Sequence, residues 1–155
     1  MEFSKAPECV VEMVHEIADQ YHARLDGTSI AVLFQDEATK SHGRANIATA
    51  SLPPKRMAPL LDGKYDFVIC IAEPEWDELD ESQRKAVVDH ELCHCALDPT
   101  SGKPFIRPHD YEEFAEVVAR HGMWRRDTAE TRIQESLLRA GIKVGTMQFQ
   151  RVAGE

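Results

Sequence analysis

The segment His90-Glu91-Leu92-Cys93-His94 places two histidines four residues apart, with a glutamate directly after the first. On a helix, residues four apart lie one above the other on the same face, so both imidazoles can reach one ion. Zinc prefers nitrogen and sulfur ligands, and Glu91 is close enough to reach a water molecule on that ion. The pattern therefore indicates hydrolysis of an amide bond by a zinc-activated water, with Glu91 as general base and then as proton donor to the departing amine.

A bare pattern of this kind arises by chance in many chains. Within this sequence, His15 and Glu16 repeat the first half of it, but Asp19 stands at the position of the second histidine. The context of residues 90–94 is more specific, because they fall on a predicted capped helix directly after a predicted buried strand. A further histidine also lies downstream, where a third ligand is needed.

A catalytic zinc ion takes three protein ligands and keeps one position open. We favour His109 as the third ligand, because imidazole binds zinc well and this residue opens a helix that can return antiparallel to the first. Asp98 is an alternative, since it lies four residues after His94 on the same helix face. Zinc sites with two histidines and a glutamate make the acidic residues of the following helix a further alternative: Glu112, Glu113 and Glu116.

Hydrophobic periodicity predicts the elements that position these residues. A first helix is predicted over residues 7–25, and strands over residues 29–35, 44–52 and 66–72. The last of these is apolar nearly throughout, which is typical of a strand buried on both faces. Asp80 and Gln83 have the spacing of a capping box and open a helix over residues 81–97, which carries both histidines.

Two further helices are predicted over residues 110–121 and 128–140, each opened by an acidic pair at capping spacing and closed by a glycine. The tail over residues 142–152 fits either a strand or an irregular end. One helix, a small sheet of about three strands and then more helices indicate an α+β fold rather than repeated βαβ units. With 155 residues and no internal repeat, we expect one domain, 1–155.

Composition and charge exclude several classes of protein. The net charge of −9 argues against a nucleic-acid partner, because phosphate binding requires clustered lysine and arginine. No apolar run approaches the ~20 residues of a membrane span, and the N-terminus lacks the pattern of a signal peptide. We therefore expect a cytoplasmic protein with no membrane partner, whose four cysteines are buried free thiols. The acidic run 73–81 is expected to be a solvated loop that leads into a helix N-terminus.

The segments AVVDHELCH and HDYEEFAEVVARHGMW resemble the putative phage metallopeptidase family, over roughly residues 29–124. They are also similar, more loosely, to SprT-like zinc proteases, in which a downstream histidine opens a helix and a phenylalanine follows. The resemblance implies a minimal zincin-like fold, with His90, His94 and His109 as zinc ligands and Glu91 as the base. It also suggests a phage or prophage origin, and so the cytoplasm of the host cell.

These patterns together predict a zinc peptidase that acts on a protein or peptide in an extended conformation. In a zincin the substrate lies beside an edge strand, for which residues 44–50 are the candidate. Tyr111, His121 and Arg107 are candidates for stabilising an oxyanion. Two other functions stay open, a non-catalytic zinc-stabilised interaction module of phage origin and a metal-dependent amidase that acts on the cell wall.

Overall fold

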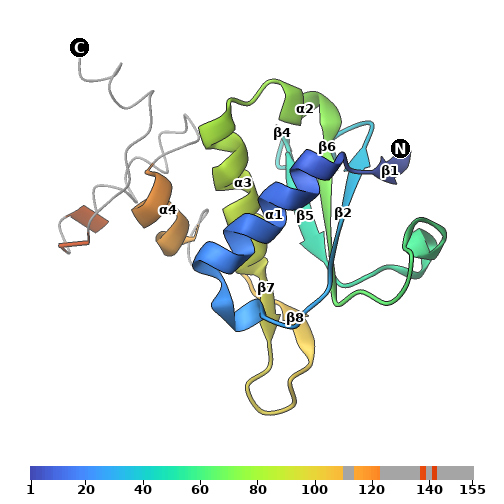
Figure 1. Cartoon of the computed structure of the whole chain (residues 1–155). Helices are drawn as coiled ribbons and strands as arrows, with labels where there is room; N and C mark the ends of the chain where they lie inside the picture. The colour runs from blue at the N-terminus through green and yellow to red at the C-terminus, as the bar shows by residue number, and fades with distance from the viewer. Residues whose placement is uncertain (110–113, 123–136, 139–140, 143–155) are drawn as a thin grey trace.

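A computed structural model of the chain describes residues 1–109, 114–122, 137–138 and 141–142. The elements in the order of the chain are β1 (Phe3–Lys5), α1 (Glu8–Tyr21), η1 (Ala23–Leu25), β2 (Ile30–Gln35), β3 (Lys40–Ser41), β4 (Arg44–Ala45), β5 (Ala48–Ser51), η2 (Lys55–Leu60), β6 (Phe67–Ala72), α2 (Glu73–Asp77), α3 (Glu81–His94), β7 (Cys95–Leu97), β8 (Pro104–Ile106) and α4 (Ala115–His121). The prediction of an α+β fold is confirmed (Figure 1).

The main sheet has four strands in the order β1-β2-β6-β5, where about three were predicted. The additional strand is β1, which is only three residues long and pairs antiparallel with the end of β2. The two central strands, β2 and β6, pair in parallel, and every residue of both is buried. Their nearly continuous apolar sequences are explained by this burial, because helices cover one face of the sheet and a loop covers the other.

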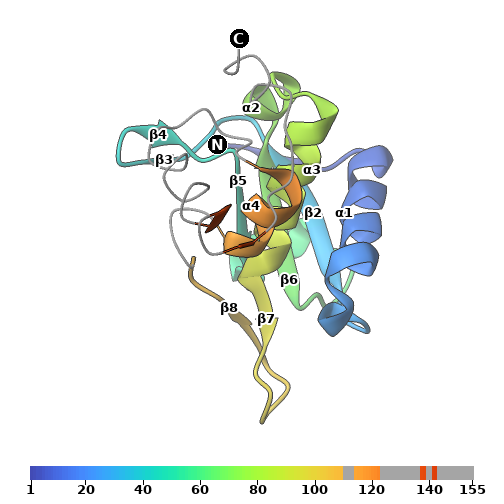
Figure 2. The same ribbon diagram turned by 90° about the vertical axis from the view of Figure 1, so that its left-hand side faces the viewer.

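Strand β5 pairs antiparallel with β6 and forms the other edge of this sheet. The single strand predicted over residues 44–52 is in fact two short ones. Arg44 and Ala45 turn back on β3 as a small ribbon, and only Ala48–Ser51 join the main sheet. Figure 2 shows this β3–β4 ribbon beside one end of β5, and β7 and β8 beyond the other end.

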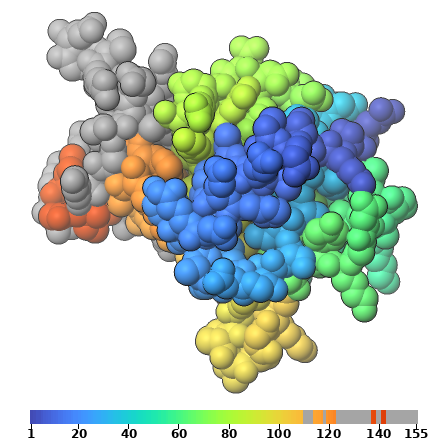
Figure 3. Space-filling view, viewed as in Figure 1, coloured from blue at the N-terminus to red at the C-terminus, as the bar shows by residue number. Residues whose placement is uncertain are grey.

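Helices α1 and α3 pack together over the same face of the sheet. Val10, Val14 and Ile17 recur at helical spacing in α1 and are all buried, which explains the hydrophobic periodicity of this segment. The α-helix ends at Tyr21, before the predicted end at residue 25, and the short 3-10 helix η1 follows it. In Figure 3, α1 (blue) lies across the middle of the face of the molecule that is turned toward the viewer. The opposite face of the sheet is closed by the segment around η2, whose Met57 packs against Val68 and other sheet residues.

The helix predicted over 81–97 ends earlier, at His94. Its start is as predicted, since Asp80 and Gln83 form the reciprocal hydrogen bonds of a capping box. Cys95 leaves the helical conformation, and Cys95–Leu97 pair antiparallel with Pro104–Ile106. Tertiary strand pairing therefore ends this helix three residues before the prediction placed its end.

The acidic run 73–81 is not the solvated loop that was predicted. It begins with the short helix α2, and Trp76 of this helix is buried with its ring beside Phe34, 6.5 Å between centroids. The indole side chain explains the difference, because burial of a large apolar group stabilises the folded state more than exposure of that group in a solvated loop. Three of the acids in this run, Glu73, Glu75 and Glu81, occupy the first turns of two successive helices, where they suit the helix dipole.

The described part of the later helices is short. Helix α4 covers Ala115–His121 of the predicted segment 110–121, and Gly122 follows with a positive φ of 70°. Residues 110–113 lie outside the described residues, as do the tail beyond Ile142 and the predicted helix 128–140, except for Leu137 and Leu138, which are helical. Within the described residues, no helix combines the length and apolar character needed to cross a bilayer.

Candidate metal centre

Three imidazole rings meet at the surface of α3. His90 and His94 lie one turn apart on this helix, and His109 comes from the segment after β8. One ring nitrogen from each histidine lies within 4.8 Å of the others, and the Nε2 atoms of His90 and His109 are 2.9 Å apart. Two nitrogen ligands on a tetrahedral zinc ion would be about 3.4 Å apart, so the donor set fits such an ion.

The β7–β8 hairpin brings His109 to the other two histidines. Strand β7 continues directly from α3, and β8 returns along it in antiparallel register. The backbone N–H of Arg107 then donates to the carbonyl of His94 at 2.7 Å. The chain is therefore tied to the end of the histidine-bearing helix two residues before His109.

The ring of His94 is oriented by this same contact. Its Nδ1 lies 2.6 Å from the carbonyl oxygen of Arg107. Because a carbonyl only accepts, Nδ1 must carry the hydrogen, and Nε2 is left with the lone pair that a metal ion needs. Histidine ligands are commonly fixed in this way, through a hydrogen bond from the ring nitrogen that does not bind the metal.

Phe114 forms an apolar base under all three rings. Its ring centroid lies 5.1 Å from His90, 4.7 Å from His94 and 5.1 Å from His109, in edge-on arrangements. The side chain is fully buried. It therefore keeps water from one side of the three imidazoles and restricts their rotation.

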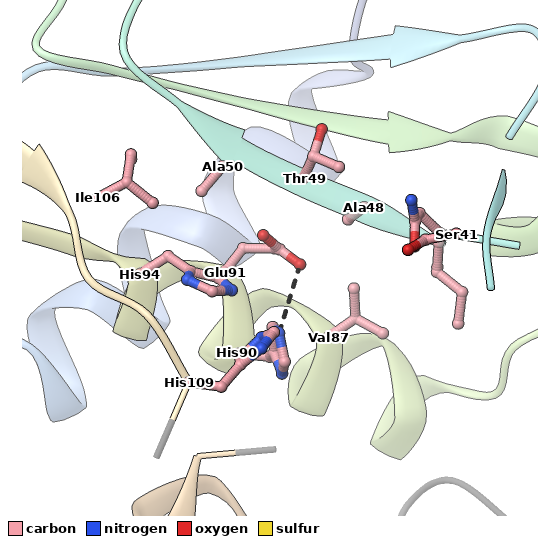
Figure 4. A pocket seen from close by; sticks show the side chains of 12 residues that line it. Ser41, Ala48, Thr49, Ala50, Val87, His90, Glu91, His94, Ile106 and His109 are labelled. Carbon is pink, nitrogen blue, oxygen red and sulfur yellow. Dashed lines mark hydrogen bonds and ion pairs between the residues drawn. The ribbon is translucent and has the colours of Figure 1, made fainter. Parts of the chain in front are cut away.

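Glu91 points into a pocket between α3 and β5 (Figure 4). Only 5% of the residue is exposed, and one carboxylate oxygen lies 3.9 Å from Nε2 of His90. The three histidines line the same pocket, together with residues from β3 to β5, α3 and β8: Ser41, Asn46, Ile47, Ala48, Thr49, Ala50, Val87 and Ile106. The carboxylate is thus placed between the imidazoles and the edge strand.

A buried carboxylate lies behind the histidines and was not singled out from the sequence. Asp89 is completely buried, and its oxygens accept hydrogen bonds from His22, Arg120 and His121 at 2.6 to 2.9 Å. Burial alone would raise the pKa of Asp89, but the hydrogen bonds from His121 and His22 and the charge of Arg120 outweigh it and hold that pKa well below its usual range.

His22, Asp89 and Cys93 also lie close enough together to be considered as a second metal site. The hydrogen bonds exclude this, because Nδ1 of His22 accepts from the guanidinium of Arg24 at 2.6 Å and Nε2 donates to Asp89 at 2.6 Å. Both ring nitrogens are therefore in use. The guanidinium of Arg120 also occupies the carboxylate that a cation would require.

Two of the alternative third ligands, Asp98 and Glu116, lie in described parts of the chain, and their carboxylates have other partners. The carboxylate of Asp98 accepts from the backbone N–H groups of Thr100 and Ser101 in the β7–β8 turn. Glu116 accepts from Arg107 and Arg120. Glu112 and Glu113 lie outside the described residues.

The candidates for an oxyanion partner are not brought into the pocket within the described residues. Arg107 extends over the ring of Phe114 and toward Glu116, and His121 donates to Asp89. Neither residue lines the pocket that contains Glu91. Tyr111 lies outside the described residues.

The four cysteines differ in exposure, which corrects the prediction that all would be buried. Cys9 is exposed, and the other three are buried. Burial raises the pKa of Cys70 to about 11 and that of Cys95 to about 12. Burial raises the pKa of Cys93 as well. Because the thiolate is the form that binds metal and reacts, Cys93 and Cys95, the two thiols that flank His94, are poor candidates for ligands.

We expect an alkylating reagent at pH 8 to modify Cys9 at least tenfold faster than the other three cysteines of the folded protein, because they are buried and protonated. Iodoacetamide labelling followed by peptide mass spectrometry measures this for each site. The variant Cys9→Ser should take up almost no label until denaturant is added. Fast labelling of Cys70 in the native protein would contradict the burial described here.

A comparison with family profiles matches residues 1–134 to the family described as Putative phage metallopeptidase. This is wider than the roughly 29–124 over which the sequence resembles that family, and it includes β1 and α1 as well as the histidines. No curated protein and no solved structure gives a significant match to the chain. A match over most of the sequence shows that this chain belongs to the Putative phage metallopeptidase family.

Proposed function

We propose that the chain is a zinc-dependent peptidase that uses Glu91 as its general base. One observation carries this proposal, which is the convergence of His90, His94 and His109 in a pocket that also contains the Glu91 carboxylate. Three imidazoles favour zinc over magnesium or calcium, which prefer oxygen ligands. A site with three protein ligands also leaves one position open for chemistry.

A zinc ion bound here would supply Lewis acidity, which lowers the pKa of water and polarises a carbonyl group. The protein's own residues supply the rest of the site. His94 is held by the Arg107 carbonyl, and the apolar ring of Phe114 shields the imidazoles. Glu91 accepts the proton of the attacking water and then delivers it to the departing amine, for which its position beside His90 is suited.

We also propose that the substrate binds as an extended peptide along β5. This strand forms an edge of the main sheet, and three of its residues, Ala48, Thr49 and Ala50, line the pocket opposite Glu91. The backbone groups on the outer side of an edge strand can pair with an added strand. Alanine side chains at positions 48 and 50 also leave the cleft open for a substrate.

Removal of the metal tests this proposal. We expect that 1,10-phenanthroline will lower the cleavage of a proteome-derived peptide library by at least about tenfold, because the Lewis acid is lost. Readdition of about one equivalent of Zn²⁺ after removal of the chelator should restore cleavage. The matched control is His90→Ala, which should hold less zinc than the wild type when both are measured by plasma mass spectrometry.

Two results would contradict the proposal. One is cleavage that continues undiminished after the metal content has fallen to background. The other is a wild-type protein that binds no more zinc than the His90→Ala control.

A further inference from the structure

A continuous chain of hydrogen bonds runs behind the three histidines. Arg120 of α4 donates from Nη1 to both oxygens of Asp89, at 2.8 and 2.9 Å, and from Nη2 to Glu116 at 3.2 Å. The other oxygen of Glu116 accepts from the guanidinium of Arg107 at 2.8 Å. Arg120 therefore connects a carboxylate on α3 with a carboxylate on α4 that contacts the segment leading to His109.

Both ends of this series of hydrogen bonds lie next to candidate metal ligands. Asp89 directly precedes His90 on α3 and is completely buried. At the other end, the backbone of Arg107 holds His94 twice, through its carbonyl to Nδ1 at 2.6 Å and through its N–H to the His94 carbonyl at 2.7 Å. A shift of Arg107 would therefore move the group that orients the His94 ring.

Aromatic contacts keep the two arginines in position. The guanidinium of Arg120 lies 4.5 Å from the ring centroid of Tyr21, and that of Arg107 lies 4.6 Å from the centroid of Phe114. Phe114 in turn contacts all three histidine rings. The two arginines therefore contact both the carboxylates behind the site and the aromatic rings of Tyr21 and Phe114.

We propose that Arg120 is a positioning residue of the metal centre, which acts by joining Asp89 to Glu116 and so fixing Arg107 and the ring of His94. This inference rests on the proposed function for the identity of the metal ligands. Arginine is suited to the role because its planar fork binds two carboxylates in fixed directions, whereas a lysine ammonium keeps the charge but not the geometry. Residues that orient metal ligands typically affect metal affinity by about 10–100-fold when they are changed.

The substitution Arg120→Lys in the full chain tests this role. We expect the dissociation constant for Zn²⁺, measured by competition with a chromophoric chelator, to rise by about 10–100-fold. We also expect the visible absorption of the Co²⁺-loaded protein to change, because that spectrum reports the arrangement of the ligands. The matched control is Met57→Ala, which removes a buried side chain on the opposite face of the sheet and should lower thermal stability without changing either signal.

The metal-free protein provides a readout that does not depend on zinc. The Nδ1 proton of His94, held by the Arg107 carbonyl, should be protected from exchange in the wild type and in Met57→Ala. In Arg120→Lys we expect this proton to exchange faster with water. NMR spectra of the three metal-free proteins measure the difference.

Unchanged protection of this proton in Arg120→Lys, or equal losses in Arg120→Lys and Met57→Ala, would overturn the positioning role. Two results can also occur together: the wild-type protein binds no zinc, and the His94 Nδ1 proton still exchanges faster in the Arg120→Lys variant. This combination would contradict the proposed function and support the positioning role of Arg120. Normal zinc affinity and normal Co²⁺ absorption in Arg120→Lys would leave the proposed function intact and remove this inference.

Discussion

The variant Glu91→Gln is expected to lower kcat for peptide cleavage by about 10²–10⁴-fold, the usual contribution of a positioned general base. Glutamine has nearly the same shape as glutamate but cannot accept a proton at neutral pH. The glutamate is buried, with only 7% of its side chain exposed, so an isosteric replacement should keep the packing of the pocket. Steady-state kinetics on one identified peptide substrate measure the effect.

Metal content separates this result from simple damage to the site. The Glu91→Gln protein should bind one equivalent of zinc with wild-type affinity, because the carboxylate is not one of the three proposed ligands. If cleavage survives the substitution, Glu91 is not the base. If wild type and variant both bind zinc and neither cleaves any peptide or cell-wall preparation, the non-catalytic interaction module becomes the better account.

The sequence predicted those parts of the fold that depend on local signals. Helix α3 begins where the Asp80–Gln83 pair placed it, because a capping box lies within four residues of the chain. Strand β6 is buried on both faces, as its nearly continuous apolar run predicted. Both features can be recognised from the residues of one short segment, although the burial of β6 is completed by its pairing with β2 and β5.

The end of α3 and the short strands could not be predicted in the same way. Cys95–Leu97 is an apolar continuation of the helix in sequence, and only its pairing with Pro104–Ile106 makes it a strand. Strand β1 has three residues, and β3 and β4 have two each, which is too short for a periodic pattern to register. Tertiary contacts decide the conformation of all of these segments.

One feature of the sequence indicates the hydrogen bonds behind the histidines. Asp89 falls at helical spacing between Ala86 and Cys93, on a face that is otherwise apolar and buried. A carboxylate in such a position requires partners, because an unpaired buried charge is strongly destabilising. The identity of those partners could not be inferred, since His22 is 67 residues away and Arg120 is 31 residues away.

Substitution of His109 is expected to have a second large effect, on zinc affinity. This effect distinguishes His109 from the acidic residues that the sequence left open as alternative third ligands. We expect His109→Ala to weaken zinc binding by more than about 100-fold, a larger loss than is typical for residues outside the ligand set. Its ring is exposed at the pocket, and its Nε2 lies 2.9 Å from that of His90, so removal of the ring should take away a ligand and leave the core intact.

Asp98→Ala is the matched control for His109→Ala within the described residues. Its carboxylate is already used by the backbone of Thr100 and Ser101, so its loss should leave zinc affinity unchanged. Glu112→Ala and Glu113→Ala complete the comparison. Loss of zinc in either glutamate variant, together with normal binding in His109→Ala, would assign the third ligand to a carboxylate. The same titration with Zn²⁺ on all four variants therefore decides between a three-histidine site and a site with two histidines and a glutamate. The two kinds of site differ in charge, because three neutral imidazoles bring no charge to the ion and a glutamate brings one negative charge.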